Sequence, residues 1–276
     1  MELSKFIPRS LAAACLVLNT ALTGALAQPV RDFEPQVGQA GKDVIWVPTP
    51  QGLVDKMLEM AKVTPVDFVI DLGSGDGRTV ISAAKLGAKA YGIEYNPDMV
   101  ELSKRNAATA GVTERVTFAK ADIFASDFSN ATVITMFLLP GLNLKLRPII
   151  LHMKPGTRVV SNNFEMGDWK ADETAQATKD CSGYCKAFLW IVPAKVEGTW
   201  QLGQSELSLQ QKYQFFTGKL TTGNVIATIT DGKLDADRIT FSAGGTRYTG
   251  QVKGNAMEGT RTSGGTDAKW EAMRSK

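Results

Sequence analysis

The spacing of hydrophobic residues changes near residue 193 of this 276-residue chain. Up to that point, short apolar runs of strand-like length alternate with segments whose apolar residues recur three or four positions apart, the period of a helix. The apolar runs cover residues 68–70, 90–94, 116–119, 133–139 and 157–161, and the helix-like segments cover residues 51–63, 79–88, 97–110 and 144–153. The alternation predicts an α/β domain over residues 41–193, with a parallel sheet wound by helices on both faces.

Beyond residue 193, apolar residues occur at every second position instead. This period is typical of a half-buried strand. It is clearest in residues 206–220, which hold Leu207, Leu209, Tyr213 and Phe215. Glycine-containing turns then recur at residues 231–232, 244–245 and 254–255. The pattern predicts a small antiparallel β-rich domain over residues 194–276, a meander or a barrel. Its opening Gly-Thr-Trp, at residues 198–200, resembles the start of lipocalin-like barrels.

The segment FVIDLGSGDGR, residues 68–78, carries the most chemical information. Its apolar start predicts a buried strand ending at the carboxylate Asp71, and a helix-like segment follows the loop. Three glycines stand at alternate positions in that loop, Gly73, Gly75 and Gly77. A strand, a glycine-rich turn and a helix in this order build a ligand-binding loop at the carboxyl edge of an α/β sheet.

The glycine spacing argues against a dinucleotide such as NAD. A dinucleotide loop has the spacing G-x-G-x-x-G, and here Arg78 stands where its third glycine would be. Asp71 would also repel a pyrophosphate, whereas it would attract a cationic or zwitterionic ligand. An NAD-dependent oxidoreductase is therefore excluded in favour of another nucleotide-like ligand.

Two more carboxylates follow later strands. Glu94 ends the predicted strand 90–94 and lies 23 residues after Asp71, the distance at which an acidic residue binds ribose hydroxyls in nucleotide-binding βαβ units. Asp122 follows the predicted strand 116–119. Because the carboxyl ends of parallel strands meet at one sheet edge, we expect the three carboxylates to surround one ligand.

These residues resemble the first motifs of the class I S-adenosylmethionine-dependent methyltransferases, whose pattern is E/D-x-G-x-G-x-G. The resemblance implies a Rossmann-like methyltransferase sheet and S-adenosyl-L-methionine as the cofactor. It implies that Asp122 accepts from the adenine amino group and that Ile123 packs on the ring. The implied cofactor-binding residues are Asp71, Gly73, Ser74, Gly75, Gly77, Glu94, Asp122 and Ile123.

Four segments resemble a narrower group, the bacterial relatives of the ATP synthase c-subunit lysine methyltransferases. They are WVPTP at 46–50, DLGSGDGR at 71–78, FLLPGLN at 137–143 and KPGTRVVSNNF at 154–164. The resemblance implies N-methylation of a protein lysine. The apolar FLLP lacks the polar N/D-P-P-Y/F signature, which disfavours an amide or nucleobase acceptor.

A lysine acceptor needs an apolar pocket, because desolvation lowers the pKa of its amine. The residues we expect to form that pocket are Trp46, Phe137, Leu138, Leu139 and Pro140. Asn162 or Glu165 could orient the amine, and no general base is assigned. Core packing or strand-end capping is the alternative role for all of these residues.

The N-terminus has the pattern of a secretory signal peptide over residues 1–27. Lys5 and Arg9 precede a mostly apolar stretch, and Ala25-Leu26-Ala27 matches a cleavage site. We therefore expect an exported, periplasmic protein without a stable transmembrane segment after cleavage, or a membrane-anchored one if the signal stays uncleaved. A lipoprotein site at Cys15 is disfavoured because the preceding apolar segment is too short.

The remaining chemistry-bearing residues give plainer expectations. In an oxidising compartment Cys181 and Cys185 would form a local disulfide. No metal site is expected, because a zinc site needs further ligands and the single histidine, His152, lies in a basic helix-like segment. A net charge of +3 indicates no nucleic-acid-binding patch. Export separates the protein from cytoplasmic cofactor, so a non-catalytic ligand- or partner-binding protein with this fold stays the alternative.

Overall fold

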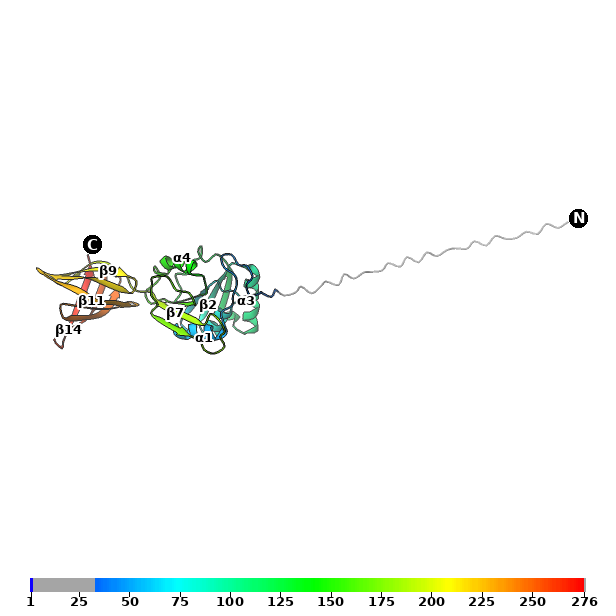
Figure 1. The fold of residues 1–276 in the computed structure, drawn as a ribbon, viewed down its shortest axis with the longest axis horizontal. Coiled ribbons are helices and arrows are strands. Elements are labelled where there is room, and N and C mark those ends of the chain that lie inside the picture. Colours follow the sequence, from blue (N-terminus) through cyan, green and yellow to red (C-terminus); the bar gives the residue numbers. More distant parts are fainter. Residues whose placement is uncertain (2–32, 276) are drawn as a thin grey trace. The chain divides into compact units, whose positions relative to one another are not determined.

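The computed structural model describes residue 1 and residues 33–275, and the predicted signal segment lies almost entirely outside them. The first part of the described chain is an α/β sheet region (Figure 1). Its helices are α1 (Gln51–Met60), α2 (Arg78–Lys85), α3 (Pro97–Thr109) and α4 (Pro140–Ile150), with a short 3-10 turn η1 (Thr113–Arg115). Its strands are β1 (Phe68–Leu72), β2 (Lys89–Glu94), β3 (Val116–Lys120), β4 (Val133–Met136), β5 (Arg158–Asn162), β6 (Glu173–Gln176) and β7 (Lys186–Ile191).

The seven strands form one sheet in the order β3-β2-β1-β4-β5-β7-β6. Strands β1 to β5 are parallel, and the β6–β7 hairpin adds two antiparallel strands at the edge beside β5. The chain runs outward from β1 to β3 and then returns to place β4 on the other side of β1. In open α/β sheets, ligands bind at such a switch point, outside the carboxyl ends of the strands.

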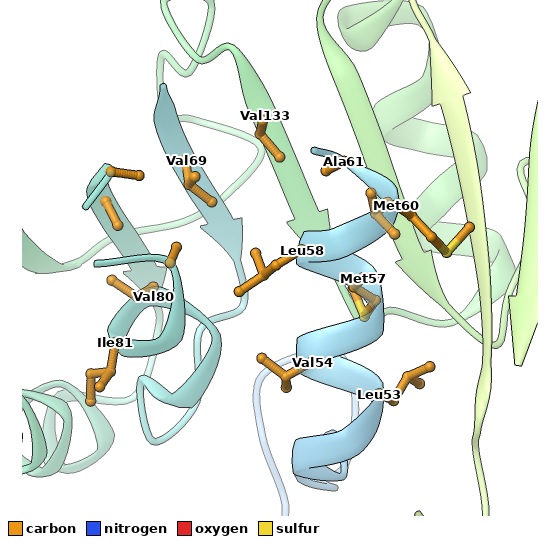
Figure 2. Packing of buried hydrophobic residues seen from close by; sticks show 14 of the residues in the cluster. Leu53, Val54, Met57, Leu58, Met60, Ala61, Val69, Val80, Ile81 and Val133 are labelled. Atoms are coloured by element: carbon orange, nitrogen blue, oxygen red, sulfur yellow. The ribbon is translucent and has the colours of Figure 1, made fainter. Parts of the chain in front are cut away.

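Two apolar clusters cover the two faces of this sheet. Residues of α1, α2 and α3 pack on one face, and residues of α4 pack on the other. Figure 2 shows the first cluster, where Leu58 of α1 points toward Val69 of β1 and Val133 of β4. Buried apolar residues on both faces explain why these strands read as continuous apolar runs. The predicted α/β fold with helices on both faces is confirmed.

Local sequence signals set the ends of the elements. Asn96 caps α3, because its side chain accepts a hydrogen bond from the Asp98 N–H, and Pro97 occupies the first helical position. In contrast, α4 begins at Pro140, four residues before the predicted start. Proline suits the first turn of a helix, where its missing N–H is not needed. Strand β4 ends at Met136, so Phe137 to Leu139 form a loop rather than the end of a strand.

The second part of the described chain is a closed antiparallel barrel in which each strand pairs with its neighbours in sequence, and β15 closes on β8. Its strands are β8 (Gly198–Leu202), β9 (Ser205–Lys212), β10 (Phe215–Thr222), β11 (Val225–Asp235), β12 (Arg238–Ala243), β13 (Thr246–Lys253), β14 (Ala256–Ser263) and β15 (Thr266–Arg274). The predicted antiparallel β-rich character is confirmed, and the barrel is the form it takes. Trp200 of the Gly-Thr-Trp segment is fully buried in the barrel core.

The predicted strand 206–220 is wrong in one respect, because a hairpin turn divides it into β9 and β10. Leu207 and Leu209 are buried, whereas Phe215 is 50% exposed and its neighbour Phe216 is buried. Directly paired residues share one face of an antiparallel sheet. Phe216 pairs with Gln211 on the inner face, so Phe215 turns outward beside Lys212. The period-two pattern was correct within each strand, and the turn reset its phase.

The structure also bears on the expected disulfide and on membrane-spanning segments. Cys181 and Cys185 form a disulfide, which confirms the expected pairing. Among the helices of residues 33–275, none is both long and apolar enough to cross a bilayer. Within the same residues, no three His, Cys, Asp or Glu side chains gather into a group that could hold a metal ion.

Candidate active site

The glycine loop after β1 has the backbone geometry that only glycine adopts easily. Gly75 and Gly77 have φ angles of +55° and +81°. A Cβ atom on Gly75 would lie 2.7 Å from Nε1 of Trp46, and one on Gly77 would lie 2.9 Å from the ring of Phe118. Gly75 therefore lets a pocket wall approach the loop, while Gly77 lets α2 start close to β3. Unlike Gly73, Ser74 and Gly75, Gly77 is not among the described residues that line the cavity beside the loop.

Glu94, at the end of β2, is fixed against the same loop. One carboxylate oxygen accepts from the Gly75 N–H and the other accepts from the Asn96 N–H, each at 2.9 Å. An ionised carboxylate has about four lone-pair positions, so each oxygen keeps one for a ligand. Glu94 therefore shapes the loop and still offers two acceptors to vicinal hydroxyls.

Asp71 lies inside the sheet edge, where only 6% of its surface is exposed. Burial raises the pKa of its carboxyl to about 7, and the nearby charges of Glu94 and Asp76 act in the same direction. A hydrogen bond of 2.7 Å from the Thr135 hydroxyl opposes that rise. Since a cationic ligand would favour the ionised carboxylate, the site is prepared for a positive group beside β1.

Asp122, after β3, is already paired. Its Oδ2 atom lies 2.6 Å from Nζ of Lys42, and its Oδ1 atom accepts from the Phe124 N–H at 2.9 Å. The hydrogen bond from Lys42 is the main cause that lowers the pKa of this carboxyl. Lys42 also lies 5.1 Å from the ring centroid of Tyr95. Lys42 was not among the predicted site residues, because no local pattern connects it to a residue 80 positions away.

These carboxylates and the loop surround one cavity of about 220 Å³. Its polar wall comes from the glycine loop, Glu94 and Asp122, and its apolar wall on that side includes Ile93, Met99 and Ile123. Acceptors for hydroxyls, a buried carboxylate for a cation and an apolar slot for a ring match an adenosyl amino acid. The residues present therefore fit S-adenosylmethionine, the cofactor of this fold.

The other end of the cavity is apolar and aromatic. Trp46, Phe137, Leu138 and Leu139 line it, whereas Pro140, which starts α4, is outside the lining. Two further rings complete this end, Phe164 after β5 and Tyr184 before β7. The ring centroid of Phe137 lies 6.1 Å from that of Phe164 and 5.4 Å from that of Tyr184. The predicted pocket thus gains two aromatic residues that were not predicted.

The two residues predicted to orient the amine lie elsewhere. The described residues that line the cavity include neither Asn162 nor Glu165. Asn162 is fully buried and donates to the Thr49 hydroxyl at 3.2 Å, and Thr49 does line the cavity. Glu165 is exposed to solvent. The structure therefore places Asn162 behind the pocket wall and Glu165 on the surface.

Comparison with known proteins agrees with this geometry. A family profile described as the ANTKMT methyltransferase domain matches residues 71–173, which end before the barrel. A protein-lysine N-methyltransferase from Saccharolobus islandicus is 47% identical over 133 residues, which are 47% of this chain and 83% of that protein. The mouse ATP synthase c-subunit lysine N-methyltransferase is 36% identical over 107 residues, 38% of this chain and only 43% of that protein.

Among solved structures, one from Salinibacter ruber, described as an RNA methyltransferase in complex with S-adenosyl-L-homocysteine, is 47% identical, with a TM-score of 0.51. The match covers 54% of this chain and 96% of the Salinibacter ruber chain. The predicted resemblance and the predicted cofactor are both confirmed. The extent and identity of these matches show that the chain belongs to the family of S-adenosylmethionine-dependent protein-lysine N-methyltransferases.

Proposed function

We propose that this protein transfers the methyl group of S-adenosylmethionine to the side-chain amine of a lysine in another protein. One observation carries the proposal. A single cavity joins three carboxylates at the ends of β1, β2 and β3 to an apolar, aromatic end beyond β4 and β5. When bound, the cofactor supplies a methyl group that its sulfonium already activates.

At the polar end of the cavity, the protein would bind the cofactor and orient it. Glu94 has the geometry to accept from two ribose hydroxyls, since both of its oxygens are held by backbone N–H groups. Asp71 would face the ammonium group of the cofactor, and Asp122 and Ile123 would lie against its adenine. Proximity and orientation of this kind can supply about 7–11 kcal/mol of the barrier in favourable cases.

At the aromatic end, the protein changes the state of the acceptor. A lysine with an ordinary pKa of about 10.4 is protonated at pH 7, and deprotonation then costs about 4.6 kcal/mol at 1.36 kcal/mol per pH unit. The aliphatic side chain of Leu138 at this end is only 5% exposed. Removing the amine from water beside it disfavours the charged form of the amine and so lowers its pKa.

Labelled methyl transfer tests the proposal. The purified protein is incubated with methyl-tritiated S-adenosylmethionine and a cell extract, and the products are divided between protease and ribonuclease digestion. We expect label that survives ribonuclease, is released by protease and maps to lysine in mass spectrometry. The variant with weakened cofactor binding is Glu94→Ala, which should give less label at a limiting cofactor concentration, and Glu101→Ala, on the exposed face of α3, serves as the control.

Each other outcome has a definite meaning. Label in RNA would overturn the lysine acceptor, and the name of the Salinibacter ruber structure makes RNA the first competitor. No label in any fraction, with S-adenosylhomocysteine still bound, would instead favour a non-catalytic binding protein with this fold.

We also propose that the protein is exported to the periplasm. The support is the basic start, the apolar stretch and the Ala25-Leu26-Ala27 site of residues 1–27. N-terminal sequencing of the protein from a periplasmic fraction should begin at Gln28. A chain that starts at Met1 and stays in the cytoplasm would contradict export.

A further inference from the structure

The loop between β6 and β7 is anchored at three places. The disulfide joins Cys181 to Cys185 within the loop, four positions apart. The Ala177 N–H donates to the carbonyl of Cys185 at 2.8 Å, which closes the base of the hairpin. The Gly52 N–H, at the start of α1, donates to the carbonyl of Asp180 at 3.2 Å. The loop is thus tied to the sheet edge and to the helix beside the cavity.

Tyr184 is the residue that these anchors present to the cavity. Its φ angle is +52°, in the left-handed region that is unfavourable for a residue with a Cβ atom. Such conformations persist where the surrounding structure determines them, and they concentrate at functional sites. The side chain is 48% exposed, so the ring stands at the mouth of the cavity rather than in its depth.

Three rings face one another at this mouth. The centroid of Tyr184 lies 5.4 Å from that of Phe137 and 6.5 Å from that of Phe164, and Phe137 lies 6.1 Å from Phe164. Phe137 follows β4, Phe164 follows β5 and Tyr184 precedes β7, so three consecutive strands of the sheet contribute one ring each. We refer to these three residues as the aromatic wall.

The strand order separates the aromatic wall from the cofactor-binding carboxylates. Glu94 and Asp122 follow β2 and β3, on one side of β1, whereas the wall belongs to the other side. Neighbouring strands lie about 4.8 Å apart, so Asp122 and Phe164 follow strands about 19 Å apart. The wall is therefore at the acceptor end of the cavity.

We propose that Tyr184, positioned by the Cys181–Cys185 disulfide, is an acceptor-binding residue that captures the cationic lysine side chain together with Phe137 and Phe164. The negative faces of aromatic rings attract ammonium groups within about 6 Å of the centroid. Capture takes place at the half-exposed mouth, where the ammonium can lose its proton to solvent water, and the neutral amine then lies beside the buried Leu138. The inference rests on the proposed lysine acceptor, and it makes acceptor affinity dependent on the redox state of the disulfide.

Peptide binding without turnover tests the role of Tyr184. The probes are a fluorescein-labelled oligolysine peptide and its Nε-acetylated counterpart, measured by fluorescence anisotropy with S-adenosylhomocysteine present. We expect tighter binding of the unacetylated peptide, an increase of about fivefold in its Kd in Tyr184→Ala, and a change below twofold in Tyr184→Phe. Phe215→Ala, which removes an exposed ring from the barrel, should leave this Kd unchanged.

The disulfide is tested by a double-mutant cycle. Replacing both cysteines by serine should weaken oligolysine binding by about the same factor as Tyr184→Ala. When it is combined with Tyr184→Ala, the same replacement should cause no further increase in the Kd for the peptide, because both changes remove the same interaction. Calorimetry of S-adenosylhomocysteine should give an unchanged Kd in every variant, which shows that the fold and the polar end are intact.

Two results would overturn the inference. One is an unchanged peptide Kd in Tyr184→Ala, and the other is fully additive losses from the disulfide and ring variants. Either can occur while labelled lysine is still found, so the proposed function would survive. Conversely, label in RNA would refute the lysine acceptor and, with it, the role of Tyr184 in binding that acceptor, even where the binding cycle itself is intact.

Discussion

The sheet region and the barrel use strands in opposite ways. In the sheet region, parallel strands end at one edge, and the switch in order between β1 and β4 opens a space for a ligand. In the barrel, each strand returns beside the last and the sheet closes on itself, which leaves no edge. Because each barrel strand pairs with the next one along the chain, the segments between strands are short turns rather than long loops.

The interiors differ in the same way. Eight strands give a barrel just wide enough for side chains to fill. Aromatic side chains help to fill this one: the ring of Phe241 stacks on that of Tyr248 with centroids 4.6 Å apart, and it meets Trp270 edge to face with centroids 6.0 Å apart. The sheet region is also packed, but the segments after its strands hold carboxylates, glycines and half-buried rings. The candidate site of the described chain therefore lies where the strand order changes, whereas the barrel core is filled by apolar side chains.

The largest expected effect separates packing from ligand binding. Trp200 is fully buried in the barrel, and its indole N–H donates to the carbonyl of Val196 at 2.8 Å. Trp200→Ala should lower the free energy of unfolding of the barrel by about 3–5 kcal/mol. Hydrogen exchange followed by mass spectrometry should show this loss in barrel peptides, whereas Phe215→Ala should change stability by less than about 0.5 kcal/mol.

The same variant can break the comparison. If the barrel only contributes packing, Trp200→Ala should leave the Kd for S-adenosylhomocysteine unchanged under conditions where both regions stay folded. A marked loss of affinity would show that the barrel supports the cofactor end of the cavity.

The second effect concerns the carboxylate that the loop depends on. Glu94→Ala removes the two acceptors that we propose for the ribose hydroxyls, and it removes the partner of the Gly75 N–H. Hydrogen bonds to charged groups contribute about 1.5–3 kcal/mol, so the Kd for S-adenosylhomocysteine in calorimetry should rise about 10- to 100-fold. Glu101→Ala on the exposed face of α3 should leave it unchanged, and an unchanged Kd in Glu94→Ala would contradict the ribose role.

The elements that sequence predicted well are those with a local period. The continuous apolar runs and the glycine loop each depend on residues within a few positions, and the structure has both. The predicted strand faces and helix starts were wrong where a local turn or proline signal was overlooked. The turn before Phe215 reversed the inward and outward positions, and Pro140 started a helix that was predicted to begin later.

The parts of the site that sequence did not predict depend on distant pairs. Lys42 meets Asp122 across 80 positions, and Thr135 meets Asp71 across 64. Tyr184 joins Phe137 and Phe164 only because β7 pairs antiparallel with β5. No period in the chain encodes such contacts, so these polar partners and the placing of Phe164 and Tyr184 in the cavity wall emerged only from the assembled sheet.

A third effect concerns pH at the buried carboxylate. Burial holds the pKa of Asp71 at about 7 in the free protein. The ammonium group at the amino-acid end, which S-adenosylmethionine and S-adenosylhomocysteine share, would lower that pKa, so binding below pH 7 must expel a proton. The affinity for S-adenosylhomocysteine should therefore be flat above pH 7 and fall by up to tenfold per unit below it. Asp71→Asn should flatten this profile, and a wild-type affinity that stays constant from pH 5 to 8 would contradict a cation contact at Asp71.

The smallest effect distinguishes the two outer carboxylates of the cofactor end. Asp122 is partly exposed and already bonded to Lys42 and to the Phe124 N–H, so less of its charge is available to a ligand than that of Glu94. Asp122→Ala should raise the Kd for S-adenosylhomocysteine by only about threefold, and the ion pair itself should weaken with added salt. Lys42→Ala is the matched variant, because it frees the Asp122 carboxylate and leaves the rest of the site in place. We expect Lys42→Ala to leave the Kd for S-adenosylhomocysteine nearly unchanged. If Asp122→Ala were instead as damaging as Glu94→Ala, the Asp122 carboxylate would have to leave Lys42 when the ligand binds. Lys42→Ala would then lower the Kd.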